Sequence, residues 1–394
     1  MDKKKKVIIA AEIFPPDIGG PATYSVKLAE DLVKKNYEVV VLTYADISKK
    51  SRRIKNQENS KGYKLVTISR NLPTILRYYV YGFKLILIAT GADVIYAQGP
   101  LSAGLPASMV KRITRARFVV KVVGDQAWER AIQFGQTNKL LDEFQNKNLK
   151  GKIGGIRKIQ NNVLRSADSI ITVSNWFKGI IKQWGIPGGR VKVIHNSVDI
   201  GYGLERVSQG LKPVDEDIIL TVGRMTKWKG IQALIEIIPE LLERNPKFKL
   251  VVVGEGPELE NLRSIVCSLK LTDKVEFTGK LSEEDVTIYY SKAKIFVLNS
   301  GYENWSHVLV EAMFHKIPVI ASQVGGNPEL VKNEQTGLLV EYNNKESLKC
   351  AIIKLWSNHG LTQKLVNNAY RQVSSYKFSD MVDLTLSVLF ESRN

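Results

Sequence analysis

The feature that most constrains the fold is an alternation of short apolar runs with helical segments along the chain. The apolar runs have the length of strands, and the segments between them carry apolar residues at helical spacing. Strands that alternate with helices pair in parallel and are covered by helices on both faces. The runs form two series: residues 7–11, 38–43, 93–97, 118–123, 169–173 and 191–194, and then 218–222, 249–253, 275–277, 295–298 and 318–321. The sequence therefore predicts two α/β domains, each with a parallel sheet.

Polar residues after the run 295–298 predict a ligand site. Glu303 would lie in the loop after that strand, and Glu311 about two turns into the helix that follows. Parallel sheets bind ligands at the C-terminal edge of their strands. The first amide groups of a helix have no intrahelical acceptor and can bind a phosphate. Carboxylates that bind hydroxyl groups, together with amides that bind a diphosphate, would suit a sugar nucleotide. The simpler alternative is a helix start whose acidic residues are only solvated.

A second element follows the run 218–222. Gly223 permits a sharp turn there, and Arg224 and Lys229 place two positive charges at the edge of the same sheet. A departing diphosphate needs such charges, because negative charge grows on its bridging oxygen as the sugar leaves. Loop-borne basic residues are usually only solvated. Two such elements, each at a strand-to-helix junction, nevertheless favour the ligand site.

With these two elements the chain resembles glycosyltransferase family 4, the retaining enzymes with the GT-B fold. The resemblance rests on Glu-x7-Glu at Glu303 and Glu311 and on Gly-Arg-x4-Lys-Gly at residues 223–230. Weaker motifs follow in the family's order: Gly19-Gly20, Asn196-Ser197-Val198-Asp199, Val253-Gly254-Glu255-Gly256-Pro257, Phe277-Thr278-Gly279 and Gly325-Gly326-Asn327-Pro328-Glu329. The ordered set spans nearly the whole chain.

The resemblance implies two Rossmann-like domains that face a central cleft, with a C-terminal helix that crosses back to the first domain. We predict an N-terminal acceptor-binding domain at residues 1–198, completed by the helix 378–394. The nucleotide-sugar-binding domain would comprise residues 199–377, and residues 199–217 read as the linker.

The resemblance also implies roles for individual residues. Predicted donor-binding residues are Gly19, Gly20, Gly223, Arg224, Lys229, Glu303, His307, Val308 and Glu311. Glu311 would hold the ribose hydroxyls, Glu303 a hydroxyl of the transferred sugar, and the helix amides a phosphate. The two glycines near the N-terminus would let the first loop approach the diphosphate. Retention would proceed by front-face attack, with the leaving phosphate assisting removal of the acceptor proton.

The chain departs from the family after the run 118–123, where many members carry a His-Asp pair. Gly124 occupies the histidine position here, and Asp125 remains. The predicted catalytic residues are therefore Arg224, Lys229, Glu303 and Asp125. Trp128 and Glu129 are candidates for contact with the acceptor. Trp128 could stack on a sugar ring or could equally be a core residue.

We predict a hexosyltransferase of class EC 2.4 with no cofactor and no metal, using a donor that is most simply UDP- or GDP-linked. Asp215-Glu216-Asp217 matches the Asp-x-Asp metal signature but lies in the predicted linker, where it is expected to be solvated. A nucleotide-sugar epimerase of similar fold and a non-catalytic GT-B surface-binding protein are the alternatives. The charged residues of the two elements argue against the second, since a pure binding protein needs no charge on a leaving group.

Charge is divided unequally between the two halves. Residues 1–198 hold 34 lysines and arginines against 14 acidic residues, a net charge of +20, whereas residues 199–394 hold 23 against 25, a net charge of −2. Basic clusters lie at residues 49–55 and 147–158. An anionic membrane surface is the favoured partner for such a domain. A solvated basic face is the alternative, and no nucleic-acid partner is expected. The acceptor is accordingly predicted to be lipid-linked or a growing glycan.

Residues 74–90 contain Arg77 and Lys84 and are too polar to span a bilayer, so they read as an amphipathic helix or a core helix. Their aromatic residues Tyr78, Tyr79, Tyr81 and Phe83 are predicted at headgroup depth. The short apolar run at residues 7–11 indicates a first strand and not a signal peptide. Cys267 and Cys350 are expected in the core. The predicted location is cytoplasmic, peripheral on the cytoplasmic face of the membrane.

Overall fold

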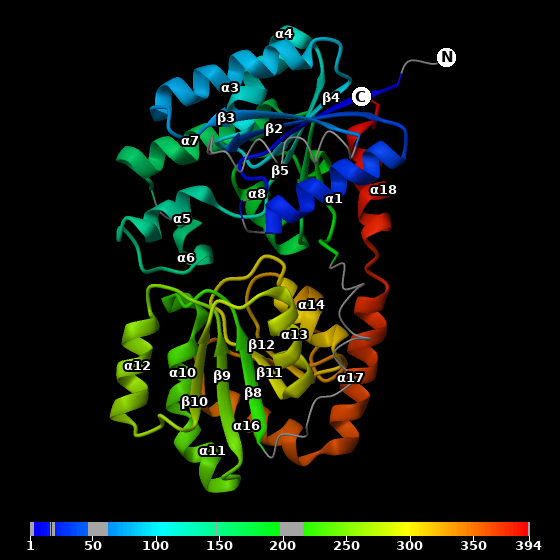
Figure 1. The fold of residues 1–394 in the computed structure, drawn as a ribbon. Helices are drawn as coiled ribbons and strands as arrows, with labels where there is room; N and C mark the ends of the chain where they lie inside the picture. The colour runs from blue at the N-terminus through cyan, green and yellow to red at the C-terminus, as the bar shows by residue number, and fades with distance from the viewer. Residues whose placement is uncertain are drawn as a thin grey trace. The chain divides into compact units, whose positions relative to one another are not determined.

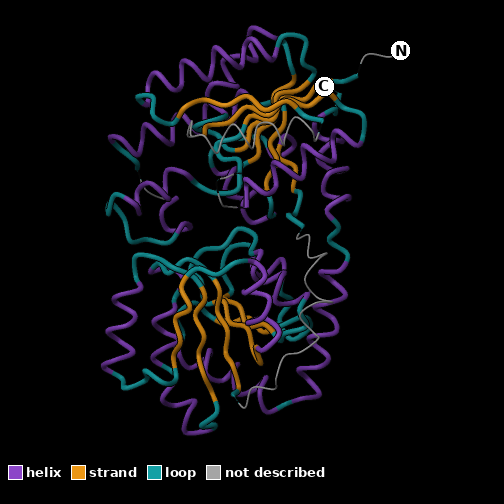
Figure 2. The backbone as a smooth tube through the Cα atoms, viewed as in Figure 1, coloured by secondary structure: helices purple, strands orange, loops and turns teal. Residues whose placement is uncertain are grey.

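The computed structural model describes residues 4–15, 17, 20–45, 62–145, 148–197 and 216–392. The chain forms two compact units, Met1–Ile194 with Ser379–Asn394, and His195–Phe378. Each unit is built on one parallel sheet covered by helices (Figures 1 and 2). The division falls at Ile194, whereas the predicted boundary was residue 198. Most of the predicted linker lies outside the described residues.

In the described part of the first unit, seven parallel strands are ordered β3-β2-β1-β4-β5-β6-β7. The strands are β1 (Lys6–Ala10), β2 (Glu38–Ala45), β3 (Lys64–Ser69), β4 (Val94–Gln98), β5 (Arg117–Lys121), β6 (Ser169–Thr172) and β7 (Val191–Val193). The helices are α1 (Gly20–Lys34), α3 (Thr74–Ala89), α4 (Gly104–Thr114), α5 (Gln126–Gln133), α6 (Leu141–Gln145), α7 (Gly151–Ser166), α8 (Asn175–Gln183), the 3-10 turn η1 (Gly188–Arg190) and α18 (Phe378–Leu389). Strand β3 was not predicted, because an edge strand is only half buried and lacks a continuous apolar run.

In the described part of the second unit, six parallel strands are ordered β10-β9-β8-β11-β12-β13. They are β8 (Asp217–Val222), β9 (Phe248–Val253), β10 (Val275–Gly279), β11 (Ala293–Leu298), β12 (Val319–Ser322) and β13 (Leu338–Val340). The helices are η2 (Lys227–Lys229), α10 (Ile231–Glu236), α11 (Ile238–Arg244), α12 (Leu259–Ser268), α13 (Glu283–Lys292), α14 (His307–Phe314), α15 (Asn327–Leu330), α16 (Lys345–Ser357) and α17 (His359–Ser374). Cys267 and Cys350 are exposed on α12 and α16, so their predicted core position is wrong.

The strand order of each sheet defines where ligands can bind. Strand order reverses between β1 and β4 in the first unit and between β8 and β11 in the second. At such a switch point the loops that leave two neighbouring strands diverge and open a crevice at their carboxyl ends. The loops after β8 and β11 are the two elements singled out in the sequence. The topology therefore brings residues 223–230 and 299–306 to one edge of one sheet.

Helix α18 returns the chain to the first unit, as predicted. Its buried face is formed by Met381, Val382, Thr385, Val388 and Leu389. Beyond the helix, Glu391 pairs with Lys192 at 2.7 Å, and the ring of Phe390 stacks on Tyr37 with centroids 5.3 Å apart. The apolar spacing of the terminal segment is thus explained by packing on the first sheet's helices and strands.

The segment read as amphipathic forms helix α3. Tyr79 and Phe83 are exposed, whereas Tyr81 is fully buried and its hydroxyl donates to the Leu42 carbonyl at 3.1 Å. The prediction of Tyr81 at headgroup depth is therefore wrong, because this residue faces the sheet. No helix in the described ranges is long and apolar enough to cross a membrane.

Candidate functional site

The two predicted elements of the second unit meet through an ion pair. Lys229, at the end of η2 after β8, contacts Glu303 in the loop after β11 through Nζ and Oε1. The two side chains are only 18% and 12% exposed. Arg224, on the same loop as Lys229, is exposed. Two charges far apart in sequence are thus held at the switch point of this sheet.

Gly230 fixes the turn that presents Lys229. Its φ of +59° lies in the left-handed region, and an added Cβ would stand 2.3 Å from the Asn299 carbonyl oxygen. The buried Asn299 donates from Nδ2 to the Gly230 carbonyl at 2.9 Å and to Asn343 Oδ1 at 2.9 Å. Only glycine combines this backbone conformation with this close approach. Sequence reasoning missed Asn299 and Asn343, because nothing in the motif indicates which side chain packs against it.

The weaker glycine motifs of the sequence support the same two loops. The amide of Gly326 donates to the Glu303 carbonyl at 2.8 Å, and a Cβ on Gly325, with φ of +62°, would lie 2.0 Å from that oxygen. The amide of Met225 donates to the Glu255 carbonyl at 2.9 Å. The segments around residues 254–256 and 325–326 therefore hold the backbones next to Arg224 and Glu303 in place.

Helix α14 carries the second glutamate. It begins at His307, with Ser306 as its N-cap, so Glu311 lies about one turn into the helix and not two as predicted. Tyr290 of α13 donates from its hydroxyl to Glu311 Oε2 at 2.9 Å. Burial raises the pKa of Glu311, and the hydrogen bond from Tyr290 opposes that rise. Glu311 is thus a partly buried carboxylate held in one orientation by a fixed donor.

The N-terminus of α14 is braced by the segment that begins the second unit. The indole nitrogen of Trp305 donates to the Asn196 carbonyl at 2.9 Å. The His195 ring stacks on Trp305 with centroids 4.1 Å apart, and Asn196 Nδ2 lies 3.3 Å from His307 Nε2. The predicted phosphate-binding amides of His307 and Val308 are therefore at the first two positions of an anchored helix.

In the first unit, Asp125 is a buried anchor. It is 0% exposed and caps α5, accepting hydrogen bonds from the amides of Ala127 and Trp128 at 3.0 and 3.3 Å. Its other oxygen accepts from Gln145 Nε2 at 3.0 Å and pairs with Arg157. Both oxygens are occupied inside the protein. In this structure Asp125 holds α5 against α6 and α7, and its predicted catalytic contact stays a prediction.

Trp128 is a core residue. It is 1% exposed, and its indole nitrogen donates to the Lys139 carbonyl at 2.9 Å. No face of the ring is open for a sugar, so the stacking alternative is excluded in this conformation. Of the predicted donor residues in this unit, Gly20 begins α1, and Gly19 lies outside the described residues.

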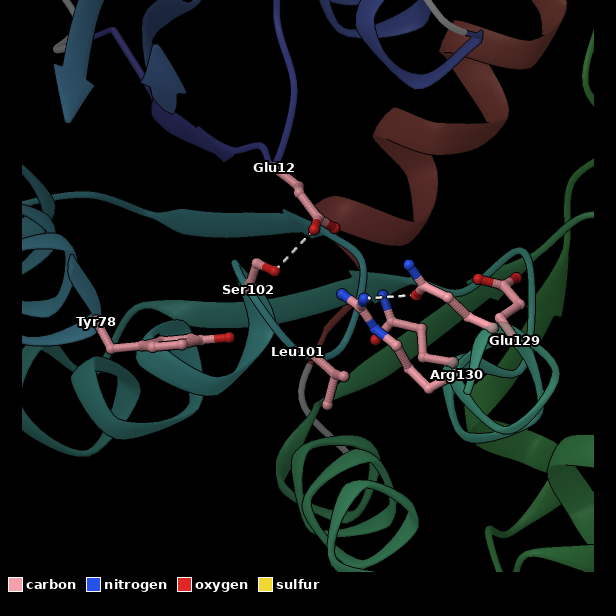
Figure 3. A pocket seen from close by; sticks show the side chains of 8 residues that line it. Glu12, Tyr78, Leu101, Ser102, Glu129 and Arg130 are labelled. Atoms are coloured by element: carbon pink, nitrogen blue, oxygen red, sulfur yellow. Dashed lines mark hydrogen bonds between the residues drawn. The ribbon is translucent and has the colours of Figure 1, made fainter. Parts of the chain in front are cut away.

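Glu129 lines a polar pocket of about 210 Å³. The pocket is formed by Glu12, Tyr78, Leu101, Ser102, Gln126, Glu129, Arg130 and Gln133 (Figure 3). Ser102 donates from its hydroxyl to Glu12 Oε1 at 2.9 Å, and the buried Oε1 of Gln126 has no hydrogen-bond partner among the described residues. Glu12 follows β1 and Ser102 follows β4, so the pocket lies at the switch point of the first sheet. The sequence indicated only Glu129 of this set.

Metal ligands are not clustered in the described part of the chain: it holds no group of three His, Cys, Asp or Glu side chains suited to a metal ion. Asp215 of the Asp-x-Asp match lies outside the described residues. Glu216 pairs with Lys249 at 3.3 Å, and Asp217 Oδ2 accepts from Asn245 and Trp356 at 2.6 and 2.9 Å.

Family models match both halves of the chain. The model described as Glycosyltransferase Family 4 covers residues 18–202, and the model described as Glycosyl transferases group 1 covers residues 205–372. The chain belongs to glycosyltransferase family 4. An uncharacterized glycosyltransferase of Methanocaldococcus jannaschii, MJ1607, is 28% identical over 97% of both chains. One component of the Arabidopsis thaliana phosphatidylinositol N-acetylglucosaminyltransferase is 24% identical over 85% of this chain and 71% of its own length.

Solved structures resemble the family 4 chain over its length and show the GT-B fold. HepE of Anabaena, solved in complex with UDP, has a TM-score of 0.77 at 20% identity and covers 98% of this chain and 99% of its own. Sucrose-phosphate synthase of Thermosynechococcus elongatus has a TM-score of 0.74 at 21% identity, with 98% of both chains covered.

In this family 4 glycosyltransferase, Glu129 makes stability depend on pH. Glu129 is exposed overall, but the protein around its carboxyl partly desolvates it and, with smaller effects of Asp125 and Glu12, raises its pKa from 4.5 to about 7. Solvent screening at an exposed residue makes the resulting effect on stability small. The folded state then holds a proton that the unfolded state releases, so stability falls as pH rises from 4.5 through 7. The Tm of Glu129→Gln should therefore be close to that of the wild type near pH 4.5. Its advantage over the wild type should grow with pH and be largest above pH 7.

Thermal unfolding across this pH range measures the effect. Glu243→Gln, on the exposed side of α11, is the matched control and should show no comparable trend. A Tm difference for Glu129→Gln that stays constant with pH would show that the carboxyl titrates at its ordinary value.

Proposed function

We propose that this protein is a retaining, metal-independent glycosyltransferase that moves a hexosyl group from a UDP- or GDP-linked donor to a lipid-linked or growing glycan acceptor. The observation that carries the proposal is the Lys229–Glu303 pair at the switch point of the second sheet, one loop away from Glu311. HepE, which shares the fold, is solved with UDP. The phosphatidylinositol N-acetylglucosaminyltransferase relative acts on a membrane lipid by its name.

The ion pair explains how donor binding and catalysis use the same residues. Without donor, Lys229 and Glu303 neutralise each other at low exposure. A diphosphate oxygen replaces the carboxylate as the partner of Lys229, and Glu303 then accepts a hydrogen bond from a hydroxyl of the transferred sugar. As the sugar departs, charge grows on the diphosphate, and Lys229 with Arg224 stabilises it most strongly in the transition state.

Glu311 and helix α14 hold the rest of the donor. The Glu311 carboxylate accepts hydrogen bonds from the ribose hydroxyls, and the amides of His307 and Val308 bind a phosphate at the positive end of the helix. The predicted contact of Gly19 and Gly20 with the diphosphate stays a prediction.

The pocket of the first unit is the proposed acceptor site. Glu12, Glu129 and the unpartnered Gln126 oxygen are hydrogen-bond acceptors, which suit the hydroxyl groups of a sugar. The acceptor hydroxyl attacks the face that the diphosphate leaves, and a departing phosphate oxygen receives its proton. Retention of configuration follows from attack on that face.

Donor screening tests the proposal most directly. A ligand that binds only the native state raises its stability, so one of the UDP-, GDP- and ADP-sugars should raise Tm. Product analysis then separates transfer from epimerisation: transfer releases the nucleoside diphosphate, whereas an epimerase leaves the sugar on its nucleotide. Failure of every nucleotide sugar to raise Tm would overturn the proposal.

Tyr290 should tune donor binding through the pKa of Glu311. Its hydrogen bond lowers that pKa, so Tyr290→Phe should raise it and reduce the ionised fraction at a given acidic pH. We expect donor affinity of Tyr290→Phe to fall at a higher pH than that of the wild type, as measured by calorimetric titrations over a pH series. Glu311→Ala should weaken donor binding at every pH, and Tyr289→Phe on the same helix is the matched control.

Coincident affinity profiles for Tyr290→Phe and the wild type, with Glu311→Ala equally unaffected, would exclude Glu311 as a ribose ligand.

A further inference from the structure

An exposed apolar stripe covers two neighbouring helices of the first unit. It consists of Ile75, Leu76, Tyr79, Phe83 and Leu87 on α3 and Met109 and Ile113 on α4, whose exposed fractions range from 47% to 73%. Four of the α3 residues recur every four positions and so share one helix face. Helices α3 and α4 pack side by side (Figure 1). Single exposed apolar residues are normal, but a contiguous set marks an interaction surface.

The opposite face of α3 packs against the rest of the first unit. Tyr81, Leu85 and Ala89 are fully buried, and Lys84 Nζ donates to the Thr67 carbonyl at 2.9 Å. The core therefore uses a different side of α3 from the stripe. Packing within the described residues of this unit explains the buried face and leaves the exposed one unexplained.

The surroundings of the stripe are basic. Residues 74–115, which comprise both helices, hold five lysines and arginines against a single acidic residue, Asp93, and two of the five, Arg112 and Arg115, are exposed. Arg112 lies between Met109 and Ile113 on the exposed side of α4. An apolar face flanked by cations suits an anionic bilayer, where tyrosine and phenylalanine lie among the headgroups and cations meet the lipid charge. A second copy would instead bring two strongly basic halves together.

We propose that the stripe docks this protein on the surface of an anionic bilayer, with Tyr79 and Phe83 inserted at headgroup depth. The proposal deepens the proposed function and rests on it for the acceptor. Tyr78, the neighbour of Tyr79 on α3, lines the acceptor pocket (Figure 3). Docking through α3 therefore places the pocket beside the headgroup layer, where a lipid-linked acceptor is presented.

The basic cluster at residues 147–158 contributes less than the sequence suggested. Arg157 is turned inward and pairs with the buried Asp125, so its charge is not available to lipid. The cluster at residues 49–55 lies outside the described residues. Lys150, Lys152 and Lys158 of the first cluster are exposed, so among the described residues they add cations to this unit's surface, while the stripe is its apolar part.

Vesicle sedimentation tests the proposal with the full chain. Wild-type protein should bind phosphatidylcholine vesicles that contain phosphatidylglycerol, bind pure phosphatidylcholine more weakly, and lose affinity as salt is added. The double variant Tyr79→Ser, Phe83→Ser should bind at least about tenfold more weakly, because burial of even one large apolar side chain is worth roughly tenfold in affinity. Arg112→Gln should reduce binding to the anionic vesicles and should flatten the salt dependence.

Leu384→Ser, which alters an exposed leucine of α18 in the same unit, is the matched control and should bind as the wild type does. Donor-induced stabilisation, measured on the same samples, should be unchanged in the double variant, because neither Tyr79 nor Phe83 is among the predicted donor-binding residues. Loss of vesicle binding with donor stabilisation intact supports the proposal and separates it from failure of the transferase itself.

Three outcomes overturn the proposal. Equal, negligible binding of wild type to neutral and anionic vesicles at low salt excludes docking. Undiminished binding by the double variant excludes the stripe. A concentration-dependent dimer in light scattering that disappears in the double variant, without vesicle binding, assigns the stripe to a second copy of the chain.

Discussion

Lys229→Ala should lower kcat by about 100-fold to 1,000-fold, the effect of removing one preorganised group that stabilises transition-state charge. Donor affinity should fall much less, because the diphosphate carries more charge on its bridging oxygen as the sugar departs than when it is first bound. The ion pair with Glu303 supplies a second reason for this difference. Lys229 exchanges one anionic partner for another on binding, so its net contribution to ground-state affinity is small.

Initial-rate kinetics and donor titration on the same preparation separate the two effects. Lys227→Ala is the matched control, because Lys227 is an exposed lysine at the start of the same short turn. It should retain near-normal kcat. Arg224→Ala should behave like Lys229→Ala with a smaller loss, since Arg224 is exposed and its charge is better screened by solvent. Unchanged kcat in both Lys229→Ala and Arg224→Ala would remove the assigned role of these cations.

Gly230→Ala should abolish activity and lower stability by about 3 kcal/mol or more, as strain at a left-handed backbone position combines with overpacking. The new Cβ would stand 2.3 Å from the Asn299 carbonyl oxygen and 2.6 Å from Asn343 Oδ1. Relief of the clash must move either the turn that carries Lys229 or the loop that carries Glu303. Catalytic geometry is therefore lost together with packing.

Thermal unfolding and donor titration measure both consequences. Gly360→Ala is the control in the same unit, because its Cβ would meet only Asn358 Oδ1 at 3.8 Å in helix α17. Its Tm should be equal to or slightly above that of the wild type, since alanine favours a helix over glycine. A Gly230→Ala variant with wild-type Tm and kcat would show that the turn is not constrained as the structure indicates.

The arrangement of two parallel sheets could be predicted from the sequence, because buried parallel strands have a recognisable pattern. Each central strand is buried on both faces and reads as a continuous apolar run, so its position and its place in two series could be predicted. Edge strands β3 and β13 were not predicted, because β3 is only partly buried and β13 has only three residues. The positions of Lys229, Glu303 and Glu311 at sheet edges followed from their places just after predicted strands.

The role of each side chain at its position was decided by tertiary contacts. Asp125 and Glu129 are four residues apart, yet one is sealed in a buried ion pair and the other lines a pocket. No local pattern distinguishes them, because Arg157 and Gln145, the partners of Asp125, come from other helices. Tyr78, Tyr79 and Tyr81 likewise share one helix and divide between pocket, solvent and core.

The sequence by itself thus determined the alternation of strands and helices apart from the edge strands β3 and β13, the two-domain organisation and the charges that lie at the edge of the second sheet. Those properties depend on periodicity and spacing along the chain. Only the tertiary structure decided that Lys229 meets Glu303, that Asn299 locks Gly230, and that the apolar stripe on α3 and α4 is exposed. The physical reason is that burial and pairing depend on neighbours that are distant in sequence, and the fold alone brings these together.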